Sequence, residues 1–133
     1  MREISFTQAL RETLATEMKR DKRVLLIGED IAAYGGAFGV TRGLVDRFGP
    51  ERVINTPISE LSFVGMAVGA ALTGMRPVVE IMFMDFIALA MDPIINMAAK
   101  LHYVFGRQAK CPLVIRTACG AGRGYGPTHS QNL

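Results

Sequence analysis

The sequence predicts an α/β domain of three layers, in which helices cover both faces of a mostly parallel sheet. Short, mostly apolar runs at 24–27, 52–55, 77–81 and 113–115 have the length of strands, and their hydrophobicity is typical of strands covered on both faces. Segments with a helical spacing of apolar residues lie between these runs. Because helices alternate with strands along the chain, a parallel sheet is favoured.

The composition is that of one domain with its own hydrophobic core. The chain has 133 residues, of which 50% are hydrophobic, so a single domain over 1–133 is expected. The 15 basic and 12 acidic residues are dispersed and give a net charge of +3. No basic run is interleaved with aromatic residues, which argues against a nucleic-acid-binding surface.

The sequence also argues against a secretory signal and a membrane span. The first residues contain no apolar signal core, and the apolar stretch 77–97 is interrupted by Glu80, Asp85 and Asp92. A spanning helix needs about 20 mostly uninterrupted apolar residues. Cys111 and Cys119 form neither a disulfide framework nor a zinc signature. A cytoplasmic location with reduced thiols is therefore expected.

The first half of the chain predicts a helix, a strand and a second, shorter helix. Ser5 begins a capping pattern, followed by an apolar stripe that includes Phe6 and Met18, and this helix should end near 19–21. The strand at 24–27 ends in Gly28-Glu-Asp30, where polar groups leave the sheet. After a glycine-rich loop, a short helix is expected over 41–48, because Gly49-Pro50 would stop it.

The second half repeats this alternation. The strand at 52–55 leads into Thr56-Pro-Ile-Ser-Glu60, and a helix should run over 61–72. Gly65 and Gly69 on that helix predict a tight packing surface or a subunit interface. A strand at 77–81 precedes a helix over 85–105 that should break near Asp92-Pro93. After the strand at 113–115, a glycine-rich tract leads to His129.

The polar residues that follow each strand are the candidate site, because ligands in such sheets bind beyond the carboxyl ends of the strands. From these residues alone, Glu60 is either an ordinary acid in the first turn of a helix or a buried carboxylate that activates a cofactor. His129 suits proton transfer near neutral pH. Met82 and Phe86 are either core residues or an apolar wall beside a flat ligand. His102, on an apolar helix, is expected to be structural or at an interface.

Eight short motifs occur in order along the chain and identify a family resemblance. The motifs are Gly28-Glu-Asp30, Gly35-Gly36, Phe38-Gly-Val-Thr-Arg-Gly-Leu44, Thr56-Pro-Ile-Ser-Glu60, Gly74-Met-Arg-Pro-Val78, Phe83-Met-Asp-Phe86, Ala98-Ala-Lys100 and His129-Ser-Gln131. Together they resemble the β subunit of the thiamine-diphosphate-dependent 2-oxo acid dehydrogenases. These are the decarboxylating components of the pyruvate and branched-chain 2-oxo acid dehydrogenase complexes. The resemblance implies the pyrimidine-binding fold of thiamine-diphosphate enzymes for almost the whole chain.

The resemblance also implies roles for five residues. In the family this domain binds the aminopyrimidine ring of thiamine diphosphate, while the α subunit holds the diphosphate and Mg²⁺. Glu60 matches the glutamate that hydrogen-bonds a pyrimidine ring nitrogen, and burial would help its carboxyl group to retain a proton. Ile58, Met82 and Phe86 are implied to line the ring, with Phe86 stacked on it. His129 resembles a histidine that assists acyl transfer to a lipoyl arm.

The sequence departs from the family at Gly39 and at its carboxyl-terminal end, and it supports no metal prediction. Gly39 stands where many relatives carry a larger residue, usually Arg. Leu113 matches one backbone position of a potassium site, but the other positions would lie past Leu133, so no metal ligand is predicted. The family's carboxyl-terminal domain is absent from these 133 residues. A truncated pyrimidine-binding domain, active only with an α-type subunit, is therefore expected.

The implied activity is oxidative decarboxylation of pyruvate or a branched-chain 2-oxo acid, with acyl transfer to the lipoyl group of a partner acyltransferase. The implied assembly is a heterotetramer of two α-type and two β-type subunits. One alternative is the β subunit of an acetoin-cleaving dehydrogenase, which uses the same cofactor and acceptor. Another is a non-catalytic interaction domain of the same fold, although Glu60 and His129 are both present.

Overall fold

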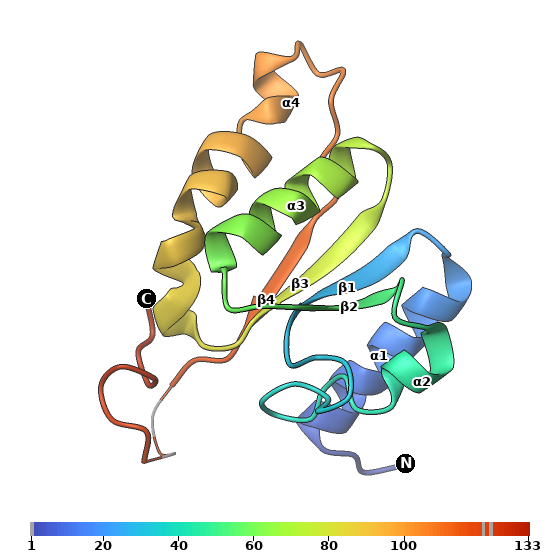
Figure 1. Cartoon of the computed structure of the whole chain (residues 1–133), viewed down its shortest axis with the longest axis vertical. Helices are drawn as coiled ribbons and strands as arrows, with labels where there is room; N and C mark the ends of the chain where they lie inside the picture. Colours follow the sequence, from blue (N-terminus) through green and yellow to red (C-terminus); the bar gives the residue numbers. More distant parts are fainter. Residues whose placement is uncertain (1, 121, 123) are drawn as a thin grey trace.

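The computed structural model describes residues 2–120, 122 and 124–133, and a sheet of four parallel strands lies at its centre. The strands have the spatial order β2-β1-β3-β4 (Figure 1). They are β1 (Val24–Glu29), β2 (Val53–Thr56), β3 (Arg76–Ile81) and β4 (Val114–Thr117). The predicted α/β class with a parallel sheet is confirmed.

Helices cover both faces of this sheet, so the chain forms the expected three layers (Figure 1). On one face lie α1 (Phe6–Arg20) and α2 (Leu44–Phe48). On the other face lie α3 (Glu60–Leu72), the 3₁₀ helix η1 (Met84–Ala90) and the π-helix η2 (Pro93–Ala98). The short helix α4 (Leu101–Val104) extends this second layer. Within the described residues, no helix is long and apolar enough to cross a membrane.

Strand β1 separates two apolar clusters, because successive side chains of a strand point to opposite faces. Leu25 and Ile27 pack towards α3, and Val24 and Leu26 pack towards α1 and α2. All six residues of β1 are buried. The continuous apolar run in the sequence therefore has the physical cause that was predicted for it, namely cover on both faces.

Helix α1 begins where the capping pattern places it, but its first residue is not part of the core. The Ser5 hydroxyl oxygen accepts a hydrogen bond from the backbone N–H of Gln8 at 3.1 Å. Met18 is fully buried, whereas Phe6 is 81% exposed. The prediction that Phe6 belongs to the buried stripe is wrong, because the first turn of α1 extends beyond the cluster of which Met18 is a member.

Three other elements differ from the expected boundaries or burial. The helix predicted over 41–48 begins only at Leu44, because Gly43 has a positive φ of 77° and ends a preceding turn. The long helix predicted over 85–105 changes from 3₁₀ to π geometry at the expected break near Pro93, which has no N–H to donate. Strand β4 lies at the edge of the sheet and is not doubly buried, since Val114 is 55% exposed.

A buried ion pair joins β3 to β4. Glu80 and Arg116 are register partners, and the Arg116 guanidinium donates to the Glu80 carboxylate. The Glu80 side chain is 7% exposed and that of Arg116 is 19% exposed. Burial raises the pKa of Glu80, and the charge of and hydrogen bond from Arg116 oppose this rise. A Cβ at Gly36 would lie 2.8 Å from Glu80 Oε1, so the absence of a side chain there makes room for the carboxylate.

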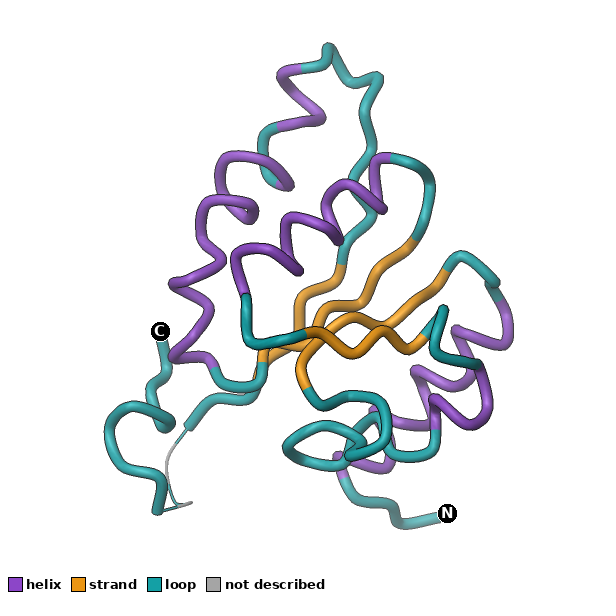
Figure 2. Tube along the Cα trace, viewed as in Figure 1, coloured by secondary structure: helices purple, strands orange, loops and turns teal. Residues whose placement is uncertain are grey.

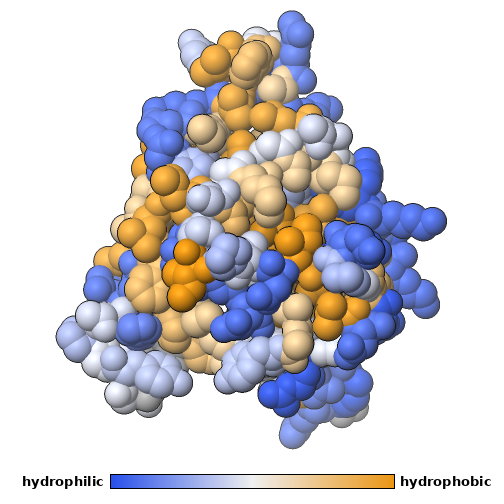
Figure 3. Space-filling view, in the orientation of Figure 1, coloured by the Kyte–Doolittle hydropathy of each residue, from blue (hydrophilic) through white to orange (hydrophobic). Residues whose placement is uncertain are grey.

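The small-residue stripe of α3 faces outward. Phe63, Val64 and Ala67 pack on the sheet, whereas a Cβ at Gly65 or Gly69 would meet no atom within 4 Å. Within this chain the stripe is therefore not a packing surface, and the subunit-interface interpretation stays a prediction. Figure 3 shows apolar patches on this face of the molecule, over α3 and the η1–η2 stretch. Exposed apolar residues there include Leu61, Met66, Leu89, Ile95 and Met97.

Candidate functional site

A cavity of about 500 Å³ lies at the carboxyl ends of the strands. Its lining comes from the loops and helix starts that follow the strands, and Figure 2 shows these connections gathered at one end of the sheet. All five residues to which the family resemblance gives a role line this one cavity. They are Ile58, Glu60, Met82, Phe86 and His129.

Glu60 enters the cavity from the first turn of α3. Its side chain is buried, with 5% of the residue exposed. Ser59 occupies the N-cap position, but its hydroxyl donates to the Pro57 carbonyl at 3.1 Å and does not cap the helix. The first turn of α3 therefore has no side-chain cap, and the Glu60 carboxyl group lies in that turn.

Glu29 is a second buried carboxyl group in the cavity. The sequence places its turn, Gly28-Glu-Asp30, at the strand ends but assigns Glu29 no role of its own. It is the last residue of β1 and pairs in register with Thr56 of β2, so it faces the start of α3. Burial raises the pKa of Glu29. The negative charges of Glu60 and Asp30 and a side-chain hydrogen bond with Glu60 raise this pKa further. A hydrogen bond from the backbone N–H of Ser59 opposes the rise. Burial and the neighbouring Glu60 carboxyl group therefore both favour the neutral form of Glu29.

One oxygen of this pair still lacks a partner. Glu29 Oε1 is buried and has no hydrogen-bond partner in the described part of the chain, and the same is true of Thr56 Oγ1. Both residues line the cavity. Unpaired buried polar atoms cost free energy, so a ligand that donates or accepts hydrogen bonds at this end of the cavity would remove that cost.

The Glu29 arrangement predicts a gain in stability for Glu29→Gln. Because the folded state raises the pKa of Glu29, it binds the proton more tightly than the unfolded state does, so the free energy of unfolding falls as pH rises above 4.5. A neutral amide removes this loss, and we expect a gain on the order of 1 kcal/mol at pH 7, the cost of one uncompensated buried polar group. The gain should shrink as pH falls to 4, where Glu29 is mostly protonated in both states.

Thermal unfolding at pH 4 and pH 7 measures this effect. Glu51→Gln is the matched control, because Glu51 is exposed in the turn before β2. This substitution removes the same charge, but from the surface. A gain of equal size at both pH values, or no gain at pH 7, would contradict the proposed cause.

The opposite wall of the cavity is apolar. Met82 and Phe86 are half-buried, and Ile58 is 84% exposed at the rim. The rings of Phe86 and His129 are 5.2 Å apart between centroids and nearly perpendicular. A hydrogen bond of 2.9 Å joins Nδ1 of His129 to the Thr128 hydroxyl. The cavity thus combines apolar walls, a carboxyl pair and an imidazole, which suits a flat, nitrogen-containing ring that exchanges a proton with a carboxyl group.

The remaining candidates lie elsewhere or have other roles. His102 is exposed on α4, where its Nδ1 is 2.8 Å from the Ala109 carbonyl oxygen. Gly39 has a φ of 69°, and a Cβ there would lie 3.7 Å from the Arg11 guanidinium and 3.8 Å from that of Arg42. These distances are ordinary van der Waals contacts, so the positive φ is the feature of this position that favours glycine. Within the described residues, no group of three or more His, Cys, Asp or Glu side chains could hold a metal ion.

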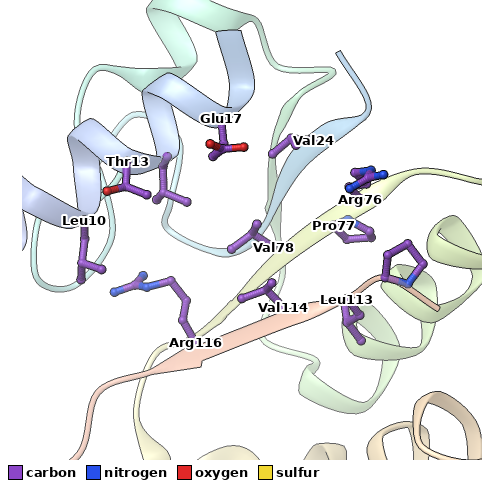
Figure 4. Close-up of a pocket in the computed structure, with 12 residues that line it drawn as sticks. Leu10, Thr13, Glu17, Val24, Arg76, Pro77, Val78, Leu113, Val114 and Arg116 are labelled. Atoms are coloured by element: carbon purple, nitrogen blue, oxygen red, sulfur yellow. The ribbon is translucent and has the colours of Figure 1, made fainter. Parts of the chain in front are cut away.

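A second hollow, of about 490 Å³, lies between α1 and the strands β3 and β4 (Figure 4). Leu10 points into it from α1, and Val78, Leu113 and Val114 line its other side (Figure 4). Leu113 is the residue that matches a potassium-site position in the resemblance. The side chains around this hollow are mainly aliphatic, and its titratable ones, Glu17, Arg76 and Arg116, include no buried carboxyl pair such as Glu29 and Glu60. The cavity at the strand ends is therefore the better candidate site.

Comparison with known proteins identifies the family of this chain. The family model described as transketolase, pyrimidine binding domain, matches residues 2–132. The β subunit of the pyruvate dehydrogenase E1 component of Rickettsia felis is 51% identical over 130 residues, which cover 98% of this chain and 40% of the relative. The mitochondrial counterpart of Saccharomyces cerevisiae is 49% identical over 126 residues, 95% of this chain and 34% of the relative.

A relative with a different printed activity is almost as similar. The β subunit of acetoin:2,6-dichlorophenolindophenol oxidoreductase of Bacillus subtilis is 46% identical over 144 residues, 99% of this chain and 42% of the relative. The chain thus spans about two fifths of the length of the curated relatives it matches. The yeast relative is named as mitochondrial and a rice relative as chloroplastic, so a cytoplasmic location stays a prediction.

Proposed function

Because the chain belongs to the transketolase pyrimidine-binding domain family, we propose that it is the pyrimidine-binding part of the β subunit of a thiamine-diphosphate-dependent 2-oxo acid dehydrogenase. One observation carries this proposal. The cavity at the strand ends brings together Ile58, Glu60, Met82, Phe86 and His129, which come from three separate segments of the chain. The names of the pyruvate dehydrogenase relatives support the same activity.

The residues of the cavity fit the aminopyrimidine end of thiamine diphosphate. When bound, that cofactor supplies the electron sink for decarboxylation of a 2-oxo acid. In the proposal, Glu60 holds a proton at a nitrogen of the pyrimidine ring, and Glu29 shares that proton through their hydrogen bond. Phe86 and Met82 form the apolar wall that excludes water from the ring, and Ile58 closes the rim when a partner covers it.

The proposal also includes a partner subunit. Thiamine diphosphate binding needs groups for the diphosphate and Mg²⁺, and the described residues offer no metal-holding cluster. An α-type subunit would supply both. The apolar surface on α3 and the η1–η2 stretch supports such a partner, because large exposed apolar patches mark interaction sites. We propose a heterotetramer of two α-type and two β-type subunits that transfers the acyl group to a lipoyl-bearing acyltransferase.

Substrate turnover by the assembled complex tests this function. The β chain is co-expressed with an α-type subunit and assayed with thiamine diphosphate, Mg²⁺ and a lipoyl domain as acceptor. Pyruvate and branched-chain 2-oxo acids are compared with acetoin, which is the second candidate because of the Bacillus subtilis relative. Preferred turnover of a 2-oxo acid supports the first assignment, and preferred turnover of acetoin supports the second. A stable complex that turns over none of them would support a non-catalytic domain.

His129→Ala is expected to slow acyl transfer to the lipoyl group by about 100-fold, the lower end of the usual contribution of a general acid–base residue. Decarboxylation should be less affected, because Glu60 and Glu29 remain. Single-turnover experiments that follow carbon dioxide release and lipoyl acylation separately measure the two steps. His102→Ala is the matched control, since His102 is the other of the two histidines in the chain and lies on α4. Normal lipoyl acylation in His129→Ala would remove His129 from the mechanism.

A further inference from the structure

In its described residues, the segment that carries His129 has no helix or strand. After β4 ends at Thr117, the described residues are turns and irregular backbone. The described glycines of this segment have φ values from 73° to 98°, a region that favours glycine. Glycine also gives the unfolded chain many alternative conformations. Within the segment, the His129 imidazole has a hydrogen bond of 2.9 Å between its Nδ1 and the Thr128 hydroxyl. Its ring contacts come from other parts of the molecule.

Two hydrogen bonds with residues at the start of η1 hold the two ends of this segment. The Met84 backbone N–H donates to the Ala118 carbonyl at 2.8 Å. At the other end, the Gln131 backbone N–H donates to Asp85 Oδ1 at 3.3 Å. Figure 1 shows the segment looping away from the end of β4, with its last residues, at the C-terminus, returning to η1. These bonds fix the backbone on either side of His129 but do not determine the orientation of its ring.

The ring contacts of His129 come from Phe83 and Phe86. The centroids of the Phe83 and His129 rings are 4.9 Å apart with an interplanar angle of 84°. Phe83 also packs edge to face on Phe86, at 6.1 Å, and on Tyr125, at 5.9 Å. Phe83 is 8% exposed. One buried ring therefore contacts both the imidazole and the ring that would stack on the pyrimidine, in the geometry that aromatic pairs prefer.

We propose that Phe83 is a positioning residue that sets the orientations of His129 and Phe86 relative to each other. The inference rests on the proposed function for its catalytic consequence, but the ring geometry is a property of this chain alone. An aliphatic side chain of similar size would fill the space without presenting a flat face and edge. The imidazole would then rotate away from its perpendicular contact with Phe86, and acyl transfer would lose the alignment it needs.

The geometric test uses nuclear magnetic resonance on the 133-residue chain with labelled histidine. The chain contains two histidines, so His102 supplies an internal control in the same spectrum. The nuclear Overhauser contact between the ring protons of His129 and Phe86 is measured in wild type, Phe83→Leu and Phe83→Tyr. We expect the contact in wild type and Phe83→Tyr and its loss in Phe83→Leu, with the His102 signals unchanged.

Two further variants keep this test decisive. Phe48→Leu removes a half-buried ring of α2 that packs against Arg47 and Arg52, and it should leave the His129–Phe86 contact intact. If Phe83→Leu does not fold, as judged by circular dichroism, Phe83→Met takes its place because Met adapts to irregular core space. A His129–Phe86 contact unchanged in a folded Phe83→Leu or Phe83→Met chain would overturn the proposal.

The kinetic test uses the complex with an α-type subunit. We expect Phe83→Leu to slow lipoyl acylation by roughly 10-fold, which is less than the ~100-fold that a 1 Å misplacement can cost. The KM for the 2-oxo acid should change little. Phe83→Tyr, which keeps an aromatic ring, should have the wild-type rate. Equal rates in Phe83→Leu and wild type would overturn the positioning role. If the wild-type complex has no turnover, the proposed function fails, and the ring contact alone then decides whether Phe83 positions His129.

Discussion

Glu60→Gln in the assembled complex is expected to lower turnover by about 10²–10⁴-fold, the range for loss of a general acid–base group. The amide has almost the volume of the carboxyl group, so the buried position at the start of α3 remains filled. It cannot take up or release a proton, however, and it ends proton sharing with Glu29. Steady-state turnover measures the loss, and calorimetric titration with thiamine diphosphate measures cofactor binding independently of activity.

Two results separate this role from a structural one. Size-exclusion chromatography should show Glu60→Gln bound to the α-type subunit as wild type is, because α3 presents its exposed residues unchanged. Glu51→Gln, which alters an exposed carboxylate before β2, should turn over normally. Turnover of Glu60→Gln close to that of wild type would sink the proposed proton transfer at the pyrimidine ring.

The sequence allowed the architecture of the site to be predicted because parallel strands place their carboxyl ends at one edge. Once strands were expected at 24–27, 52–55 and 77–81, Glu60 and Phe86 had to lie at that edge. The structure confirms the strands and places both residues in one cavity. The catalytic roles themselves came from the family resemblance, and they stay predictions, because no spacing of residues distinguishes a cofactor-activating acid from a helix-start acid.

Glu29 and Phe83 lie in motifs that the sequence singled out, but their contacts could not be predicted, for a different physical reason. The Glu29 carboxyl group reaches Glu60 only because β1 and β2 pair with Glu29 opposite Thr56, and register is not visible in a single sequence. In the sequence, Phe83 looks like an ordinary apolar core residue. Its contact with His129 joins two residues that are 46 positions apart in the chain. Errors at Phe6 and β4 arose likewise, since local apolar spacing does not reveal where a helix or strand extends past the core.

Arg116→Met is expected to lower the free energy of unfolding by about 3–5 kcal/mol at pH 7, the usual cost of leaving a buried charge without its partner. Glu80 would remain, 7% exposed, between Gly36 and β4 with no opposing guanidinium. That loss is a large share of the ~5–15 kcal/mol that stabilises a typical domain. Chemical and thermal unfolding of the 133-residue chain measure it.

The pH dependence and the double variant identify Glu80 as the cause. Burial alone would then act on the pKa of Glu80, which already lies above 4.5 with Arg116 present, so the folded state would bind the proton still more tightly. The destabilisation should therefore shrink as pH falls to 4, where Glu80 is neutral in both states. Glu80→Gln/Arg116→Met should recover most of the loss at pH 7, because a buried amide carries no charge. Arg20→Met, at an exposed ion pair with Glu17, should have almost no effect.

One outcome would contradict this cause. If the loss of stability in Arg116→Met does not depend on pH and is not relieved by Glu80→Gln, the effect comes from packing around Leu10 and Val114 and not from charge.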